Sequence, residues 1–151
     1  MSEIERIKDQ LRRAFEGSAW HGPSLKELVS DVTAEKAAAR PLAGAHNIWE
    51  IVLHIAAWHE GARLRLAGQR AELSTEEDWP PVTDMSEAAW LAALETLERN
   101  NQRLRAALDS LDEARLNEPI VEGMSSVYVT LHGIIQHDLY HAGQIALLKK
   151  G

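Results

Sequence analysis

Apolar residues recur every three to four positions in four long segments, the spacing that places them on one face of an α-helix. These segments cover about residues 3–16, 47–67, 86–111 and 126–149. In the third segment the apolar positions step alternately by four and three residues, a seam that suits left-handed helix packing. Its members are Trp90, Leu94, Leu97, Asn101, Leu104, Leu108 and Leu111. We therefore expect four long helices.

Helix start and stop signals divide the chain between these segments. Ser24 and Asn47 each precede a glutamate by three residues, which is the pattern of a helix N-terminus. We expect a short helix from about Ser24, and either Ser86 or Asp84 as the cap of the third long helix. An acidic run and two adjacent prolines predict no regular structure through Pro81. Pro119 and Gly123 interrupt helicity before the last helix.

The predicted elements favour an all-α four-helix bundle that forms a single domain over residues 1–151. No stretch alternates convincingly as a strand. The connection over residues 17–46 is long enough to cross the bundle, so the pattern does not dictate a simple up-down-up-down order.

Composition and charge narrow the function classes. The chain has no cysteine, which excludes disulfides and thiolate catalysis by the protein itself. Its net charge of -7 opposes nucleic-acid binding, which relies on basic surfaces. The charged N-terminal segment lacks the apolar core of a signal peptide, and no window is long and apolar enough for a membrane helix. We expect a cytoplasmic protein.

Two histidines stand on the apolar face of the last segment. His137 and His141 are four residues apart, so both imidazoles lie on one side of a helix and could share one metal ion. His54, on the inward stripe of the second long helix, offers a third ligand. Three imidazoles leave a coordination position open for water or substrate, as in catalytic metal sites.

Each histidine taken alone is better explained by a structural role, because a single histidine on an apolar face is more often a hydrogen-bonded core residue than a metal ligand. Two at this spacing cost desolvation twice, which favours the metal hypothesis. We expect surface exposure for His59, and structural or solvated positions for His46 and His132. Glu50 and Asp138 could each orient a ligand, but surface exposure is the better interpretation for both. Several other residues are candidates for the pocket or for the metal's outer shell: Trp20, His21, Trp58, Asn101 and Gln144. For Asn101, a hydrogen bond that fixes helix register is the alternative.

The sequence resembles the DinB/YfiT-like superfamily of metal-dependent proteins over nearly its whole length. The resemblance rests on HNIWEIVLHIAAWHE at 46–60 and LHGIIQHDLYHAGQIALL at 131–148, with AWHGPSL at 19–25 and EDWPP at 77–81. Its most specific part is the inward histidine of the second long helix together with H-x-x-x-H-x-G-Q-I on the last. The resemblance implies an up-down-down-up bundle, commonly paired as a homodimer, in which His54, His137 and His141 match the metal ligands.

The resemblance also implies a range of functions. Imidazole ligands allow nickel, zinc, iron or manganese. Relatives include transferases and an isomerase that depend on low-molecular-weight thiols, so we expect a metal-dependent enzyme, either a thiol S-transferase or a hydrolase-like protein, that acts on a small thiol and an electrophile. The alternative is a stress-related module that holds a metal or small ligand without turnover. No residue pattern identifies the general base, the thiol or the electrophile.

Overall fold

The computed structural model describes residues 1–151 and contains helices and loops but no β-strand. Its long helices are α1 (Glu3–Phe15), α4 (Ile48–Leu66), α6 (Glu87–Ala107) and α7 (Val127–Leu148). The short ones are α2 (Leu25–Val29), α3 (Ala34–Ala38) and α5 (Thr75–Asp78), with the 3-10 helices η1 (Leu108–Ser110) and η2 (Glu113–Asn117). The predicted all-α bundle is confirmed. None of these helices is both long and apolar enough to cross a lipid bilayer.

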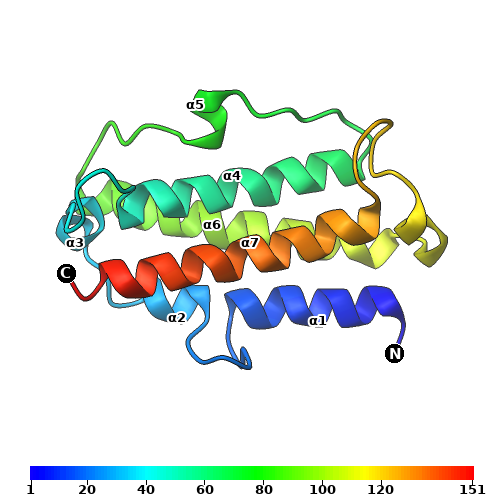
Figure 1. Ribbon diagram of the computed structural model, residues 1–151, viewed down its shortest axis with the longest axis horizontal. Coiled ribbons are helices and arrows are strands. Elements are labelled where there is room, and N and C mark those ends of the chain that lie inside the picture. The colour runs from blue at the N-terminus through cyan, green and yellow to red at the C-terminus, as the bar shows by residue number, and fades with distance from the viewer.

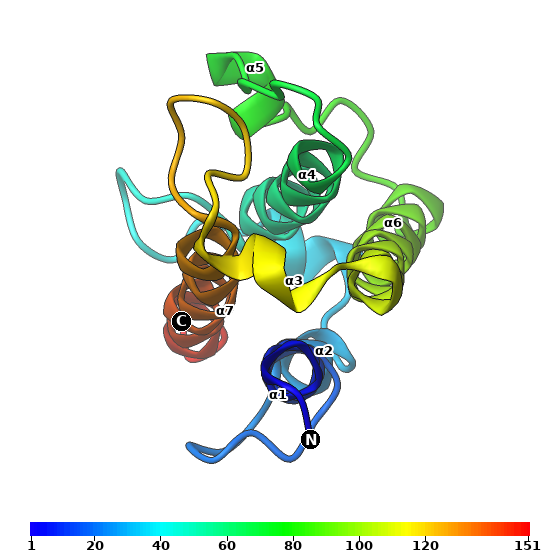
Figure 2. The ribbon, with the colours of Figure 1, turned by 90° about the vertical axis from the view of Figure 1, so that its right-hand side faces the viewer.

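The four long helices pack as a square seen end-on in Figure 2. Helix α4 packs against α6 and α7, and α1 packs against the same two helices from the opposite corner. In Figure 1, α1 and α7 run from right to left, whereas α4 and α6 run from left to right. The connection from α1 to α4 carries α2 and α3 and reaches the left end of the bundle in Figure 1, where α4 begins at the corner opposite α1.

Side-chain caps fix where the long helices begin. Asn47 caps α4, its Oδ1 accepting from the backbone N–H of Glu50 at 2.8 Å. Ser86, rather than Asp84, caps α6, and the Asp84 carboxylate instead accepts from the backbone N–H of Ser86. Ser126 caps α7. The sequence signals therefore identified Asn47 as a helix start and left Ser86 as one of two candidates, between which the structure decides.

Helix α5 corrects the expectation of irregular structure through Pro81. Ser74 caps it by accepting from the backbone N–H of Glu77, and acidic residues in its first turn suit the positive end of a helix. The prolines act only on the end of this helix, because the residue before Pro80 is driven out of the helical region, and Trp79 has φ -124° and ψ 76°. The helix therefore ends at Asp78, and this end faces α4.

The apolar core has two parts. One surrounds Trp49 and Trp90 between α2, α3, α4, α6 and the C-terminal half of α7. The other lies between α1, the C-terminal ends of α4 and α6, and the N-terminal half of α7. Between them along the helices come buried polar side chains: His59 of α4, Asn101 of α6 and Asp138 of α7. The bundle thus has a polar layer across its middle.

Candidate metal centre

Three imidazoles from α4 and α7 converge on one point. The Nε2 atoms of His54 and His137 are 2.9 Å apart, and those of His137 and His141 are 3.1 Å apart. His54 and His141 are each 5 % exposed, and His137 is half-buried. We call His54, His137 and His141 the three-histidine cluster. The i, i+4 spacing on α7 and the inward stripe of α4 bring together the residues that the sequence singled out.

His54 is oriented by the end of α5. Its Nδ1–H donates to the backbone carbonyl of Asp78 at 2.6 Å, and a carboxylate oxygen of the same residue lies 3.1 Å away. The last carbonyls of a helix have no intrahelical partner, so the imidazole satisfies one of them. Trp79 then stacks on the His54 ring at 3.8 Å between centroids. Helix α5 therefore fixes both the plane and the tautomer of this imidazole.

His141 is oriented by its own helix. Gln144 lies one turn later, and its Oε1 accepts from Nδ1–H of His141 at 2.6 Å. A neutral imidazole that carries its proton on Nδ1 has a lone pair on Nε2. His54 and His141 consequently both point a lone pair at Nε2 of His137. The Nδ1 atom of His137 is buried and has no protein partner.

This donor set fits a divalent metal ion. Nitrogens at about 2.05 Å from one ion lie about 3.3 Å apart in tetrahedral geometry and about 2.9 Å apart in octahedral geometry. The two separations that involve His137, 2.9 and 3.1 Å, lie within this range, and the three ligand atoms all lie within 4.8 Å of one another. A proton on Nε2 of His137 can satisfy only one of the two lone pairs that face it, whereas a cation satisfies all three nitrogens. Ligands whose other ring nitrogen donates to a carbonyl are the usual arrangement around bound metals.

The electrostatics disfavour the protonated forms of His137 and His141. Burial, reinforced by the neighbouring imidazoles of His141 and His54, lowers the pKa of His137 from 6.5 to about 3. Burial also lowers the pKa of His141, against the opposing effect of the Gln144 hydrogen bond. Only the neutral imidazole binds a metal, so the protons that would compete for these nitrogens are already disfavoured at neutral pH.

Cavities lie on both sides of the cluster. The larger, about 740 Å³, reaches His54 and His137 and is walled by α4, the first turns of α7 and the loop around Met124. The smaller, about 360 Å³, reaches His141 on the other side of Trp79. The larger volume suits a small organic molecule. A ligand there would contact the ring faces and edges of the cluster.

Some of the other predicted pocket residues lie beside the cluster. Trp58 lines the larger cavity and its Nε1–H donates to the Asp78 carboxylate at 2.7 Å, while its ring is 6.2 Å from that of His137. Gln144 contacts His141 directly. Asp78 and Trp79 also belong to the site but were not singled out from the sequence. The signal for them was present in EDWPP, where two prolines end the helical turn directly under α4.

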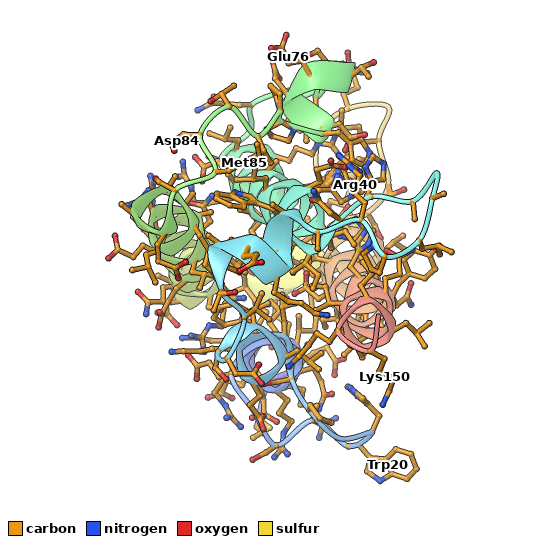
Figure 3. The ribbon with its side chains drawn as sticks, turned by 90° about the vertical axis from the view of Figure 1, so that its left-hand side faces the viewer. Trp20, Arg40, Glu76, Asp84, Met85 and Lys150 are labelled. Atoms are coloured by element: carbon orange, nitrogen blue, oxygen red, sulfur yellow. The ribbon has the colours of Figure 1, made fainter.

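Three expectations are wrong. Trp20 and His21 lie in the exposed turn between α1 and α2, and Figure 3 shows Trp20 projecting away from the bundle. His21 bonds only the nearby carbonyl of Pro23. Asn101 is fully buried, but its amide bonds no protein group, so it makes no register-fixing hydrogen bond. The hydrogen bond from α6 to α4 comes instead from Asn100 to the carbonyl of Ala56 at 3.0 Å.

His59 and Asp138 are also corrected, because both are fully buried rather than exposed. Nε2–H of His59 donates to both oxygens of Asp138, at 2.8 and 2.9 Å, across the middle of the bundle. Each residue looked exposed because it comes one position after an inward-facing neighbour. Nε2–H of His59 and the Asp138 carboxylate satisfy one another there, which position alone did not reveal, while Nδ1 of His59 bonds no protein group. Glu50 points outward to Arg40 and His46, and not to the cluster.

Comparison with known proteins gives a family but no individual relative. Residues 19–145 match the sequence profile described as the DinB superfamily. The match includes all three histidines of the cluster, helix α5 and the walls of the larger cavity. No curated protein and no solved structure matched the chain.

Proposed function

The chain belongs to the DinB superfamily, and from that premise we propose that it is a metal-dependent enzyme that transfers a low-molecular-weight thiol to an electrophile. The observation that carries the proposal is the convergence of three imidazole nitrogens beside a cavity of about 740 Å³. His54, His137 and His141 would hold a divalent ion. When bound, the ion would favour the thiolate over the thiol and so supply the nucleophile near neutral pH.

The protein's own residues would bind and orient the reactants. Trp58, Met124 and Ile134 give the cavity an apolar wall that excludes water from the sulfur and the electrophile. Trp79 and the Asp78 carbonyl hold the His54 ring still while the substrate binds. In the transfer, the thiol proton leaves to solvent. The sulfur electron pair forms the bond to carbon, and the leaving group departs with its bonding pair.

The metal part of the proposal is tested by elemental analysis of untagged protein. We expect close to one divalent ion per chain in the wild type and only traces in the triple variant His54→Ala, His137→Ala, His141→Ala. His46→Ala and His132→Ala are matched controls. His46 lies just before α4 and His132 lies on α7, and neither belongs to the cluster. Equal metal content in the wild type and the triple variant would overturn the proposal.

The transferase part is tested with a panel of thiols, glutathione, coenzyme A, bacillithiol and mycothiol, against model electrophiles. We expect metal-dependent consumption of at least one thiol, lost in His137→Ala. A second candidate, a binding module without turnover, is favoured by one observation: both carboxylates of the larger cavity are already engaged, Asp78 by Trp58 and Glu72 by Arg70. It predicts the same metal content with no thiol consumed.

A further inference from the structure

The larger cavity contains a single cationic side chain, Arg65 of α4. Its Nε–H donates to the backbone carbonyl of Ala71 at 2.9 Å, which fixes the direction of the guanidinium. Its two terminal nitrogens bond no protein group, and no carboxylate forms an ion pair with it. Glu72 pairs with Arg70 instead, and Asp78 lies beside His54. Arg65 is therefore an oriented cation whose donors are free to meet a ligand.

The position of Arg65 relative to the cluster gives an upper limit to the length of a ligand that contacts both. The guanidinium carbon lies 5.3 Å from the centre of the Trp58 ring, whose centroid is 6.2 Å from that of His137. The guanidinium is therefore at most about 11.5 Å from the His137 ring. The guanidinium lies over the Trp58 ring, and the same ring is T-shaped to that of His137. A chain of several atoms that lies along Trp58 can reach both ends.

The charge around Arg65 favours an anion at this end of the cavity. The first turns of α7 supply Ser125, Val129 and Thr130 to the wall, so the positive end of a long helix faces the same space. Asp78 lies toward the histidines, with its charge shared between Trp58 and His54. Glu72 is mostly exposed and paired with Arg70. A divalent ion would change the formal charge of the lining side chains from -1 to +1.

We infer that Arg65 binds the carboxylate of the thiol cosubstrate, so that this cavity selects thiols carrying a carboxylate several atoms from the sulfur. The inference rests on the proposed function, which places the sulfur at the three-histidine cluster. Guanidinium and carboxylate match as a planar, two-pronged pair, which a neutral end group does not reproduce. Arg65 would thus determine specificity through binding while the cluster provides the reactive end.

The test compares two thiols of equal length on protein loaded with cobalt(II), ω-mercaptohexanoate and ω-mercaptohexanol. Sulfur binding is monitored by the thiolate-to-cobalt charge-transfer absorption, which gives a dissociation constant for each thiol without any turnover. We expect the wild type to bind the carboxylate about tenfold more tightly or better. In Arg65→Gln the two dissociation constants should become equal within about twofold, because the charged partner is gone.

Arg63→Gln is the matched control. Arg63 is two residues earlier on α4, pairs with Glu60 and does not line this cavity, so its variant should keep the wild-type preference. Equal affinity of the wild type for both thiols, or a preference that survives in Arg65→Gln, overturns the inference.

The absence of a charge-transfer band with either thiol counts instead against the proposed function. In that case a ¹⁵N NMR titration of zinc-loaded protein decides the inference separately. The Arg65 Nε–H resonance must respond to hexanoate and not to hexanol.

Discussion

Helices α4 and α7 carry two neighbouring groups of polar side chains that include histidine, and the partners of the histidines differ between the groups. In the three-histidine cluster, each Nε2 atom faces another imidazole. Five residues after His54, the Nε2 atom of His59 faces both carboxylate oxygens of Asp138. We call the second group the His59–Asp138 pair. The first group presents lone pairs that a cation could accept, whereas the second provides its own anion.

The two groups also differ in whether a ligand can reach them. The cluster borders two cavities, while the side chains of His59 and Asp138 are 0 % exposed and lie between the two parts of the apolar core. A buried imidazole beside neutral neighbours and an open cavity is suited to bind a metal and a substrate. A buried imidazole sealed against a carboxylate is suited to join helices. The comparison separates a functional histidine from a structural one by its partner rather than by its burial.

The largest expected effect comes from breaking the His59–Asp138 pair. Asp138→Ala leaves a buried imidazole without its acceptor, and removing one partner of such a pair typically costs about 3–5 kcal/mol. We expect this loss in the free energy of unfolding of metal-free protein, measured by urea denaturation. A loss below about 1 kcal/mol would mean that the pair does not stabilise the bundle.

A double variant checks that the loss comes from the unpaired partner and not from the cavity alone. His59→Leu together with Asp138→Val replaces the pair with apolar side chains and leaves no polar group unpaired. Such replacements are often neutral or stabilising. The double variant should therefore be more stable than Asp138→Ala.

The next effect concerns the groups that orient the cluster. Gln144→Leu removes the only acceptor for Nδ1–H of His141. We therefore expect metal affinity to fall about 10–100-fold, the usual cost of removing a group that hydrogen-bonds a metal ligand. Asp78→Ala should cost less, because the backbone carbonyl that accepts from His54 at 2.6 Å remains. Both are measured by competition with a chromophoric chelator. The reverse order would show that the Asp78 carboxylate, and not the carbonyl, orients His54.

Much of the fold and the cluster could be predicted from local sequence rules. Periodicity and caps located α4, α6 and α7 because these helices obey spacing and N-cap chemistry that act over a few residues. His137 and His141 share a face for the same reason. The placement of His54 opposite them needed the resemblance as well, since periodicity indicates which face points inward but not at which level along a neighbouring helix.

The residues that were missed depend on contacts between distant segments. Asp78 and Trp79 reach His54 across 24 residues of chain, through the end of α5. His59 and Asp138 are buried because each satisfies the other across 79 residues. A polar residue one position beyond an apolar stripe looks exposed when its partner is unknown. Trp20, by contrast, was a candidate for the pocket and is fully exposed.

The next effect in size is the loss of folding stability in acid, which depends on His137 of the three-histidine cluster. The pKa of His137 is about 3 in the folded chain and 6.5 as its ordinary value, so between these pH values the unfolded chain binds a proton that the folded chain does not. The stability of chelator-treated protein should therefore fall as pH decreases from 6.5 toward 3, and be flat above 6.5. The slope cannot exceed about 1.4 kcal/mol per pH unit for this one proton, and solvent around the half-buried ring reduces it.

Urea denaturation at pH 7.5 and pH 5.0 measures this response in a range above the titration of most carboxylates. His137→Phe is the comparison variant, because it keeps an aromatic ring without a titrating group. We expect a smaller difference between the two pH values in this variant than in the wild type. An equal difference in both would assign the acid response to other groups.

The smallest effect is expected at the edge of the cluster. His46 stacks on one face of Trp79 at 3.6 Å and His54 stacks on the other at 3.8 Å, so the three rings form a continuous stack that leads to the three-histidine cluster. Yet the His46 side chain is 49 % exposed and pairs with Glu50, and exposed pairs contribute about 0–1 kcal/mol. His46→Ala should therefore change metal affinity by less than about fivefold in the same chelator competition. A loss as large as that of Gln144→Leu would place His46 among the groups that position the ligands, and the boundary between the cluster and the surface would then lie beyond Trp79.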